Sequence, residues 1–400
     1  GDKWVFRGGY GITQYQEGTG ANLRLPLNPP FFFESQTDWA YSAAAPTNAG
    51  TIATGFQGLQ ALDGISGQLR VWDPNLRPQL TQQYNVFVEY LLGPRSSINV
   101  GYVGNRSKYL VAPIEGNQPL PGVGDPSTWA PIQTRRPLYQ YNPLVTNIAT
   151  TSPAARSDYN ALQTTFKQRL WNGLDFVANY TLSKSMSNNL GYYGSGGVAS
   201  EGAYPVNSRD IDMNYGPAFF DARHIVSLAG SYAIPVGADR QFGSGMNRVL
   251  DTIIGGWDVS FGLTAHTGYP ITVQDSSNPS LQVTRSTQWP DLVGDPVPSN
   301  QSITNWLNRD AFRSAPLGQF GNAGVGVATA PGYWNVDFSL SKRITTFGRQ
   351  YFLIRGEAYN LFNHPNFGPP DRNIQSQNFG TITSVVNPPR EIQFVVKYYF

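Results

Sequence analysis

Residues 257–266 read WDVSFGLTAH, and residues 334–341 read WNVDFSLS. In both stretches every second residue is apolar, from Trp257 to Ala265 and from Trp334 to Leu340, while most of the residues between them are polar. Strict period-two alternation indicates a β-strand with one apolar and one polar face. Each apolar face begins with Trp, a residue that is enriched where strands meet a membrane interface. The two stretches therefore predict membrane-spanning β-strands.

The same alternation predicts ten strands, near 4–11, 80–92, 96–108, 156–170, 174–185, 219–233, 255–267, 333–344, 350–362 and 390–400. Most are about twice as long as the usual strand of a soluble domain, which has five or six residues. The gaps between them alternate in length. Long gaps lie near 12–79, 109–155, 186–218, 268–332 and 363–389, and shorter ones near 93–95, 171–173, 234–254 and 345–349. Outer-membrane barrels have short periplasmic turns and long extracellular loops, so the pattern predicts an all-β, antiparallel transmembrane β-barrel.

The composition agrees with this fold. Aromatic residues make up 13% of the 400 residues and charged residues only 14%, against about 25% charged in a typical soluble protein. No apolar run approaches the 18 residues of a transmembrane helix. The net charge of +2 and the scattered basic residues argue against nucleic acid as a partner, and the absence of cysteine excludes disulfides and thiolate chemistry.

The last predicted strand carries a second signal. Its apolar face is Ile392, Phe394, Val396, Tyr398 and Phe400. A strand with one lipid-facing side and an unpaired edge is suited to pair with a template strand. We therefore expect these five residues to form the assembly signal that is presented to the barrel-assembly machinery.

Several motifs resemble one family. They are DYNALQ at 158–163, GL at 173–174, YTLSK at 180–184, FDARH at 220–224, NLFNHPNFG at 360–368 and FGTIT at 379–383. Together they resemble the barrel of TonB-dependent receptors, in particular the receptor-like proteins with a carboxypeptidase-regulatory-like domain that are common in Acidobacteria and similar to the Oar proteins. The resemblance covers most of 80–400.

The resemblance implies a barrel of about 22 strands, an N-terminal plug and a periplasmic TonB-contacting segment. Neither the plug nor the contact segment is recognised here, so residues 1–400 are expected to be the C-terminal portion of such a barrel. The resemblance also implies a location in the cell outer membrane, with outer-membrane lipid, the TonB system (through the missing N-terminal part) and an unknown nutrient ligand as partners.

Catalytic or metal-binding chemistry finds little support in the sequence. His224, His266 and His364 have no metal-ligand spacing, and the run from Asp221 to His224 is better explained as a rim salt bridge or hydrogen-bond cluster. A Ca²⁺ site at Asp210, Asp212 and Asp221 is a weaker alternative, because the spacing is unlike that of an EF-hand. We therefore predict neither an enzyme nor a resident cofactor or metal.

Two functions remain open after this. The first is import of a bulky nutrient, such as an oligosaccharide, a peptide or a metal chelate. The second is a surface adhesin or carbohydrate-binding β protein without active transport. Both would use loop aromatics that stack on a ligand, and the candidate contacts are Trp129, Tyr139, Tyr141, Tyr192, Tyr193 and Trp289.

Overall fold

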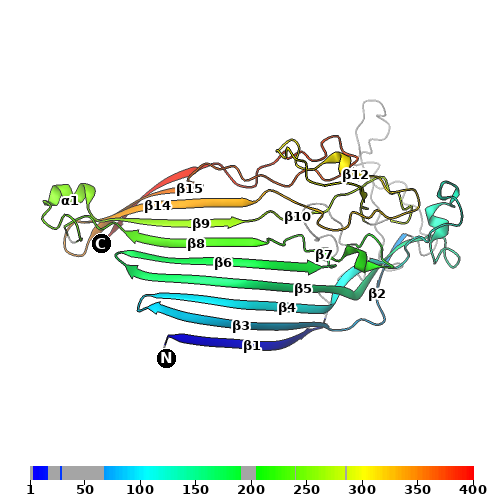
Figure 1. Cartoon of the computed structure of the whole chain (residues 1–400), viewed down its shortest axis with the longest axis horizontal. Helices are drawn as coiled ribbons and strands as arrows, with labels where there is room; N and C mark the ends of the chain where they lie inside the picture. The colour runs from blue at the N-terminus through cyan, green and yellow to red at the C-terminus, as the bar shows by residue number, and fades with distance from the viewer. Residues whose placement is uncertain (1–2, 17–27, 29–66, 191–203, 239, 284–285) are drawn as a thin grey trace, which may run out of the picture.

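The computed structural model describes residues 3–16, 28, 67–190, 204–238, 240–283 and 286–400 (Figure 1). Ten long antiparallel strands form one sheet, with β1 and β16 at its edges. They are β1 (Trp4–Tyr15), β3 (Gln79–Gly93), β4 (Ser96–Glu115), β5 (Val145–Trp171), β6 (Leu174–Ser187), β8 (His224–Ala233), β9 (Trp257–His266), β14 (Tyr333–Thr345), β15 (Tyr351–Tyr359) and β16 (Glu391–Tyr399). Each lies where the alternation predicts a strand.

Several boundaries differ from the sequence-based prediction, and one strand was not predicted. β4 and β5 continue as a pair beyond the alternating segments, through register shifts next to Leu110, so β5 begins at Val145 rather than near residue 156. β8 begins at His224 rather than near residue 219, because a turn in which the Asp221 N–H donates to the Ala218 carbonyl at 2.8 Å precedes it. The long gap after β1 contains β2 (Gly67–Trp72), which pairs in parallel with β5.

The connections separate the two ends of the sheet. At one end, which we call the turn end, the links are 94–95, 172–173, 234–256 and 346–350. At the other, the loop end, the links are 116–144, 188–223, 267–332 and 360–390 (Figure 1). The predicted alternation of long and short connections is therefore confirmed.

The two-residue connection between β5 and β6 depends on Asn172 and Gly173, whose φ angles are +48° and +86°. A two-residue type I′ hairpin needs positive φ at both positions, which Asn and Gly tolerate best. The longest turn-end link contains the short helix α1 (Arg248–Ile254), which is capped by the Asn247 side chain. Among the described residues, no helix combines the length and the apolar character needed to cross a membrane.

The strand register collects the apolar alternating residues on one face across all ten strands. In the middle of the sheet, for example, Phe261 lies opposite both Gly230 and Phe338, and Phe338 lies opposite Ala358. We call this the apolar face. It comprises, among others, Trp4, Phe6, Tyr10, Tyr84, Val86, Val88, Tyr90, Ile98, Val100, Tyr102, Leu162, Phe166, Phe176, Tyr180, Leu182, Val226, Leu228, Val259, Phe261, Leu263, Trp334, Val336, Phe338, Leu340, Phe352, Ile354, Ile392, Phe394, Val396 and Tyr398.

Much of the apolar face is uncovered by protein. Phe6 is 72% exposed, Val86 61% and Phe394 82%. A contiguous exposed apolar surface of this kind marks a contact with another apolar phase or partner. The opposite, polar face carries charged residues, some of them in ion pairs, including Arg7 with Glu89 at 2.8 Å and Arg355 with Glu357 at 3.1 Å.

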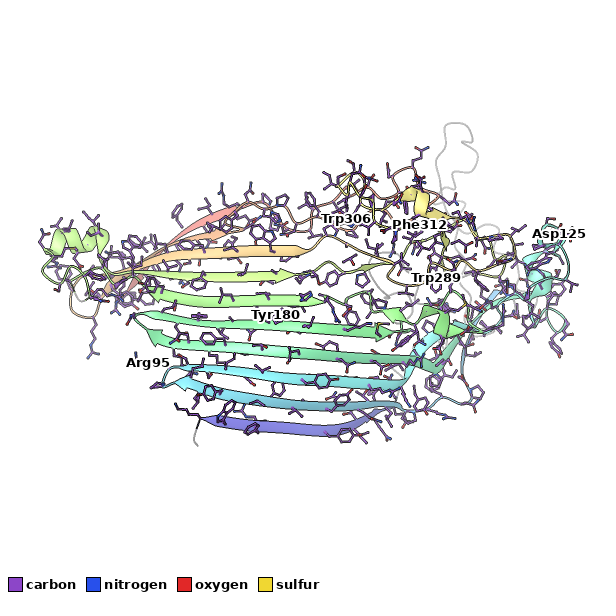
Figure 2. All side chains as sticks on the ribbon, in the orientation of Figure 1. Arg95, Asp125, Tyr180, Trp289, Trp306 and Phe312 are labelled. Carbon is purple, nitrogen blue, oxygen red and sulfur yellow. The ribbon has the colours of Figure 1, made fainter. Side chains whose placement is uncertain are left out.

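The loop-end connections fold into a layer of their own, which we call the loop layer. It contains the short strands β7 (Gly216–Pro217), β10 (Pro270–Ile271), β11 (Asp291–Leu292), β12 (Phe312–Arg313) and β13 (Ala328–Thr329), besides short 3₁₀ turns. Two small apolar clusters hold it together. One joins 267–332 to 360–390 through Leu307, Phe312 and Phe379. The other joins the segment around Val206 to Trp289, which Figure 2 places among the loop-end connections.

Candidate functional site

A cavity of about 570 Å³ lies at the loop end, between the connections 267–332 and 360–390. This volume is within the range of small-molecule sites, about 300–1,000 Å³. Its lining residues are His266, Tyr269, Pro270, Ile271, Gln274, Ala330, Pro331, Gly332, Tyr333, Phe367, Gly368, Pro369, Pro370, Asp371, Arg372, Asn373, Thr383 and Val386.

One wall of the cavity is aromatic. His266 ends β9 and Tyr333 begins β14, and the register pairs them on the polar face of the sheet. Their rings stack at 5.3 Å with an interplanar angle of 11°, and Tyr269 lies 5.0 Å from His266. The His266 Nδ1 lies 2.8 Å from the Thr267 carbonyl oxygen, which only accepts, so Nδ1 carries the proton. This hydrogen bond fixes the ring against Tyr333.

The other wall is polar and joins two loops. The Gln274 N–H donates to the Arg372 carbonyl, and the Ile374 N–H donates to the Gln274 carbonyl, both at 2.9 Å. The Gln274 side chain is 7% exposed, and its Nε2 has no hydrogen-bond partner in the described part of the chain. A buried N–H without an acceptor is costly, by about 1–3 kcal/mol. An acceptor oxygen that reached this N–H would remove that cost.

The Asp371 carboxylate at this wall is already engaged. It accepts the Asn373 N–H at 3.0 Å and the Ser376 hydroxyl at 2.5 Å. Its oxygens are therefore used to shape the loop, whereas the Gln274 Nε2 is a buried donor without a partner among the described residues.

Next to the cavity, Asp275 is almost fully buried within the same pair of loops. Burial alone would raise the pKa of this carboxyl, but hydrogen bonds from Ser277, Ser314 and Gln375 outweigh it, so that the pKa lies below its ordinary value. The Ser277 N–H and hydroxyl donate to Oδ1 at 2.9 and 2.6 Å. Asp275 therefore stays charged at neutral pH and ties 267–332 to the segment that contains Gln375.

Among the described residues, the aromatic side chains singled out in the sequence do not line this cavity. Trp129 packs beneath Arg135, whose guanidinium lies 5.2 Å from the ring, in the same connection as Asp125 at the far tip of the loop layer (Figure 2). In that connection Tyr141 is 77% exposed, and Tyr139 is partly buried. Trp289 is 5% exposed and packs against Val206 and Val283, so we leave it out of the ligand-contacting set. Tyr192 and Tyr193 lie outside the described residues.

The acidic and histidine residues discussed above are dispersed. Asp212 pairs with Arg156 at 3.3 Å, and Asp221 accepts the Ser185 N–H at 2.8 Å. Burial raises the pKa of the Asp221 carboxyl. His224 hydrogen-bonds the Tyr180 hydroxyl at 2.8 Å, as expected for a rim cluster. Within the described ranges, no group of three or more His, Asp or Glu residues is placed to hold a metal ion.

The cavity residues were missed in the sequence for a physical reason. His266 and Tyr333 stand at the ends of two predicted strands that flank a long gap, and this position is the signal that would have found them. No local sequence feature identifies Gln274, because the backbone hydrogen bonds that hold it at the cavity are made with residues 372–374, about a hundred positions away.

The chain is also similar to proteins of known family or structure. The model of a family described as "Outer membrane beta barrel domain" matches residues 1–393. None of the curated proteins matches the sequence.

Solved structures similar to the chain include one transporter and two receptors. The outer-membrane transporter YddB from Escherichia coli has 11% identity and a TM-score of 0.44, covering 84% of this chain and 35% of its own. The ferric-catecholate import receptor Fiu from E. coli K12 has 10% identity and a TM-score of 0.42, with 100% and 33% covered. The siderophore receptor PirA from Acinetobacter baumannii has 11% identity and a TM-score of 0.37, with 81% and 32% covered. The chain spans about a third of the length of each.

Proposed function

Because the chain belongs to the family of outer membrane β-barrel domains, we propose that it forms part of the barrel wall of an outer-membrane receptor that imports a bulky nutrient. The outer membrane is where the chain resides. In such a barrel the apolar face meets lipid and the polar face lines the lumen. The single observation that carries the proposal is the cavity at the loop end, with its aromatic wall and the unpaired donor of Gln274.

The position of the cavity suits capture before import. His266 and Tyr333 are on the polar face, so their rings lie on the side of the sheet that would face the lumen. Loops at the mouth of a rigid barrel are where binding residues commonly lie. We further propose that the long connections face the outside of the cell and that the chain is the C-terminal portion of a TonB-dependent, Oar-like receptor. The motifs at 158–163, 180–184 and 360–368 support that assignment.

Depletion of a complex growth medium tests import. A strain that lacks the full-length protein is compared with strains that carry the wild type or the Gln274→Leu variant, at equal outer-membrane abundance. We expect the wild type to deplete a set of bulky solutes that the other two strains leave behind, as measured by mass spectrometry of the spent medium. A proton uncoupler should abolish that depletion if uptake is active. Identical depletion by the deletion strain would contradict import.

Surface recognition without import is the second candidate function, and the 77% exposure of Tyr141 favours it. Tyr141 lies outside the cavity lining, so Tyr141→Ser serves as the matched variant. Normal depletion with loss of adhesion to glycan-coated beads would support surface recognition by the loop tip. Loss of depletion in Gln274→Leu alone would support the cavity.

The assembly role of Ile392, Phe394, Val396, Tyr398 and Phe400 stays a proposal. These residues share the apolar face, and Phe400 is 98% exposed. β16 lies at the edge of the sheet, and one side of its backbone pairs with none of the described strands.

A further inference from the structure

The short helix α1 at the turn end directs its apolar side chains away from the protein. Val249, Leu250, Ile253 and Ile254 follow one another at spacings of three and four residues, which places them on one side of the helix. We call this side the apolar stripe. All four residues are exposed, Val249 at 72% and Ile253 at 62%. A surface helix of a water-soluble protein normally turns such a stripe toward the core, so the orientation of α1 is the reverse of the usual one.

The polar side of α1 is the side that packs on the protein. The Asp251 carboxylate accepts the Ala238 N–H at 2.7 Å. Directly after the helix, the Gly255 N–H donates to the Asp251 carbonyl at 3.0 Å. A Cβ at Gly255 would meet the Asp251 carboxylate and the backbone of Gly237, so the chain approaches itself closely here. These contacts fix the rotation of α1 about its axis, and the fold therefore sets the outward direction of the apolar stripe.

Two residues of the apolar face hold the last turn of α1. Lys342 on β14 lies opposite Trp257 on β9 in the strand register. Lys342 is 4% exposed, and its ammonium donates to the carbonyl oxygens of Asp251, at 2.8 Å, and Gly255. The Trp257 indole N–H donates to the Ile253 carbonyl at 3.0 Å. α1 is therefore attached to the apolar face at the turn end of the sheet (Figure 1).

The position of Lys342 fits the border between hydrocarbon and polar surroundings. Its backbone continues the alternation of the apolar face, where an ammonium without hydrogen bonds would be costly in contact with lipid. Lysines in such positions extend their charged end toward polar groups. Lys342 finds these groups at the C-terminal end of α1, where a cation also interacts favourably with the helix dipole.

Aromatic residues mark the same border along the turn end. Trp4 on β1, Tyr90 on β3, Trp257 on β9 and Tyr398 on β16 all lie on the apolar face near the strand ends. The rings of Trp4 and Tyr90 are 4.4 Å apart. Trp and Tyr are enriched where membrane-spanning strands reach the headgroup region. Because Trp257 is hydrogen-bonded to α1, the helix lies at the level of this aromatic row.

We propose that α1 is an interfacial helix whose apolar stripe inserts among the acyl chains of phospholipids in the leaflet at the turn end. Amphipathic helices of this kind lie in the plane of the interface, with the apolar side at the boundary between headgroups and acyl chains. The apolar stripe extends the apolar face past the ends of β9 and β14, so that one lipid phase covers both. The proposal rests on residence in the outer membrane and does not depend on import.

Fluorescence quenching of the full-length protein in phospholipid nanodiscs tests the insertion of α1. Residues 1–400 contain no cysteine, so Ile253→Cys gives one labelling site in this chain, with any cysteine elsewhere replaced by Ser. The label is an environment-sensitive nitrobenzoxadiazole dye. The quenchers are phosphatidylcholine brominated near the headgroup and aqueous iodide. We expect a blue-shifted emission that the brominated lipid quenches and from which iodide is excluded.

The matched control is Thr252→Cys. Thr252 is the neighbouring residue of the same helix and is exposed, but it lies to the side of the apolar stripe. Its label should be quenched by iodide and little affected by the brominated lipid. Heat-modifiable migration on gels confirms that each labelled variant has assembled. Leu250→Cys provides a second position on the stripe if Ile253→Cys does not assemble.

Three results would overturn the proposal. Equal quenching by iodide at positions 253 and 252 would place α1 in water. Equal quenching by brominated lipid at both positions would mean that the dye, and not the apolar stripe, enters the membrane. Protection of the label at position 253 from both quenchers would show that protein covers the stripe, either a second copy or another part of the full-length chain.

Discussion

The long-stranded sheet and the loop layer are stabilised in different ways. In the sheet, neighbouring strands are joined by ladders such as the twelve paired positions between β1 and β3, and the apolar side chains point away from the rest of the protein. In the loop layer, Leu307 is 1% exposed and packs against Phe379, which lies in another long connection. The stability of the sheet therefore depends on what contacts its apolar face, and the stability of the loop layer depends on packing within the protein.

Polar contacts contribute much of that internal packing. Arg136 donates from Nη1 to the Asn117 carbonyl at 2.8 Å and from Nη2 to the Asn147 side chain at 2.9 Å. Arg209 donates to the carbonyls of Gln118 and Pro119 at 3.2 and 3.0 Å. Burial lowers the pKa of both guanidinium groups, yet each remains charged. Buried polar groups are tolerated when they are hydrogen-bonded, so these contacts fix a loop conformation that has only small apolar clusters.

The largest effect is expected where the sheet has a free edge. Phe400→Asp places a charge at the end of the apolar face, where the Phe400 ring lies 6.2 Å from Tyr398. We expect most of the protein to accumulate as protease-sensitive periplasmic material, because an unpaired strand with an apolar face aggregates. Heat-modifiable migration measures the assembled fraction.

Tyr399→Ser is the matched control for this change. Tyr399 lies on the polar face and stacks on Tyr351 at 4.6 Å, so its loss should affect assembly little. Normal assembly of Phe400→Asp would show that the apolar end of β16 is not read during insertion.

In the loop layer, the largest effect is expected at Leu307, which is 1% exposed between Phe312 and Phe379. Leu307→Ala should destabilise the layer by about 2–5 kcal/mol, the usual cost of such a cavity. Hydrogen exchange should rise in 267–332 and 360–390 while the long strands stay protected. Leu317→Ala, at a position that is 47% exposed in the same connection, should change little. Equal exchange changes in the sheet would mean that the two regions unfold as one unit.

A charge in the middle of the apolar face tests whether the sheet depends on contact with lipid. Phe338→Arg should cost about 2–4 kcal/mol in a bilayer if this position meets the lipid midplane. The neighbouring Ser339→Arg projects from the polar face and should be mild. Denaturant unfolding in lipid vesicles measures both. If the two changes were tolerated equally, the assignment of one face to lipid and the other to the lumen would be wrong.

The smallest effect concerns Asp221, whose pKa is raised mainly by burial. The folded protein therefore binds the proton of this carboxyl more tightly than the unfolded chain does. The stabilisation that this proton contributes is fully present below the unfolded pKa, about 3.9, and is lost as pH rises through the folded pKa. Asp221→Asn should therefore stabilise the protein slightly at pH 7, by about 0.5 kcal/mol or less. The Asn oxygen still accepts the Ser185 N–H.

Thermal unfolding at pH 7 and at pH 3.5 separates this effect from a change in packing. The advantage of Asp221→Asn should disappear at the lower pH, where the wild-type carboxyl is protonated. An advantage of the same size at both pH values would show that titration is not its source.

The ten long strands could be predicted because each carries its own local pattern. Segments without this alternation were not predicted as strands. Residues 145–155 read VTNIATTSPAA, without regular alternation, and they form strand only because β4 extends beside them. β2 was missed for the same reason, since its pairing partner, β5, lies more than seventy residues away. Of the candidate site, only the strand ends that carry His266 and Tyr333 were visible in the sequence.

The sequence by itself determined the strands, their polarity and the end at which each connection lies, because a period of two assigns every side chain in a strand to one of two faces. Tertiary structure decided the rest. The cavity exists because Gln274 bonds the backbone of residues 372–374. It joins residues that are far apart in the chain, and no local pattern specifies such distances.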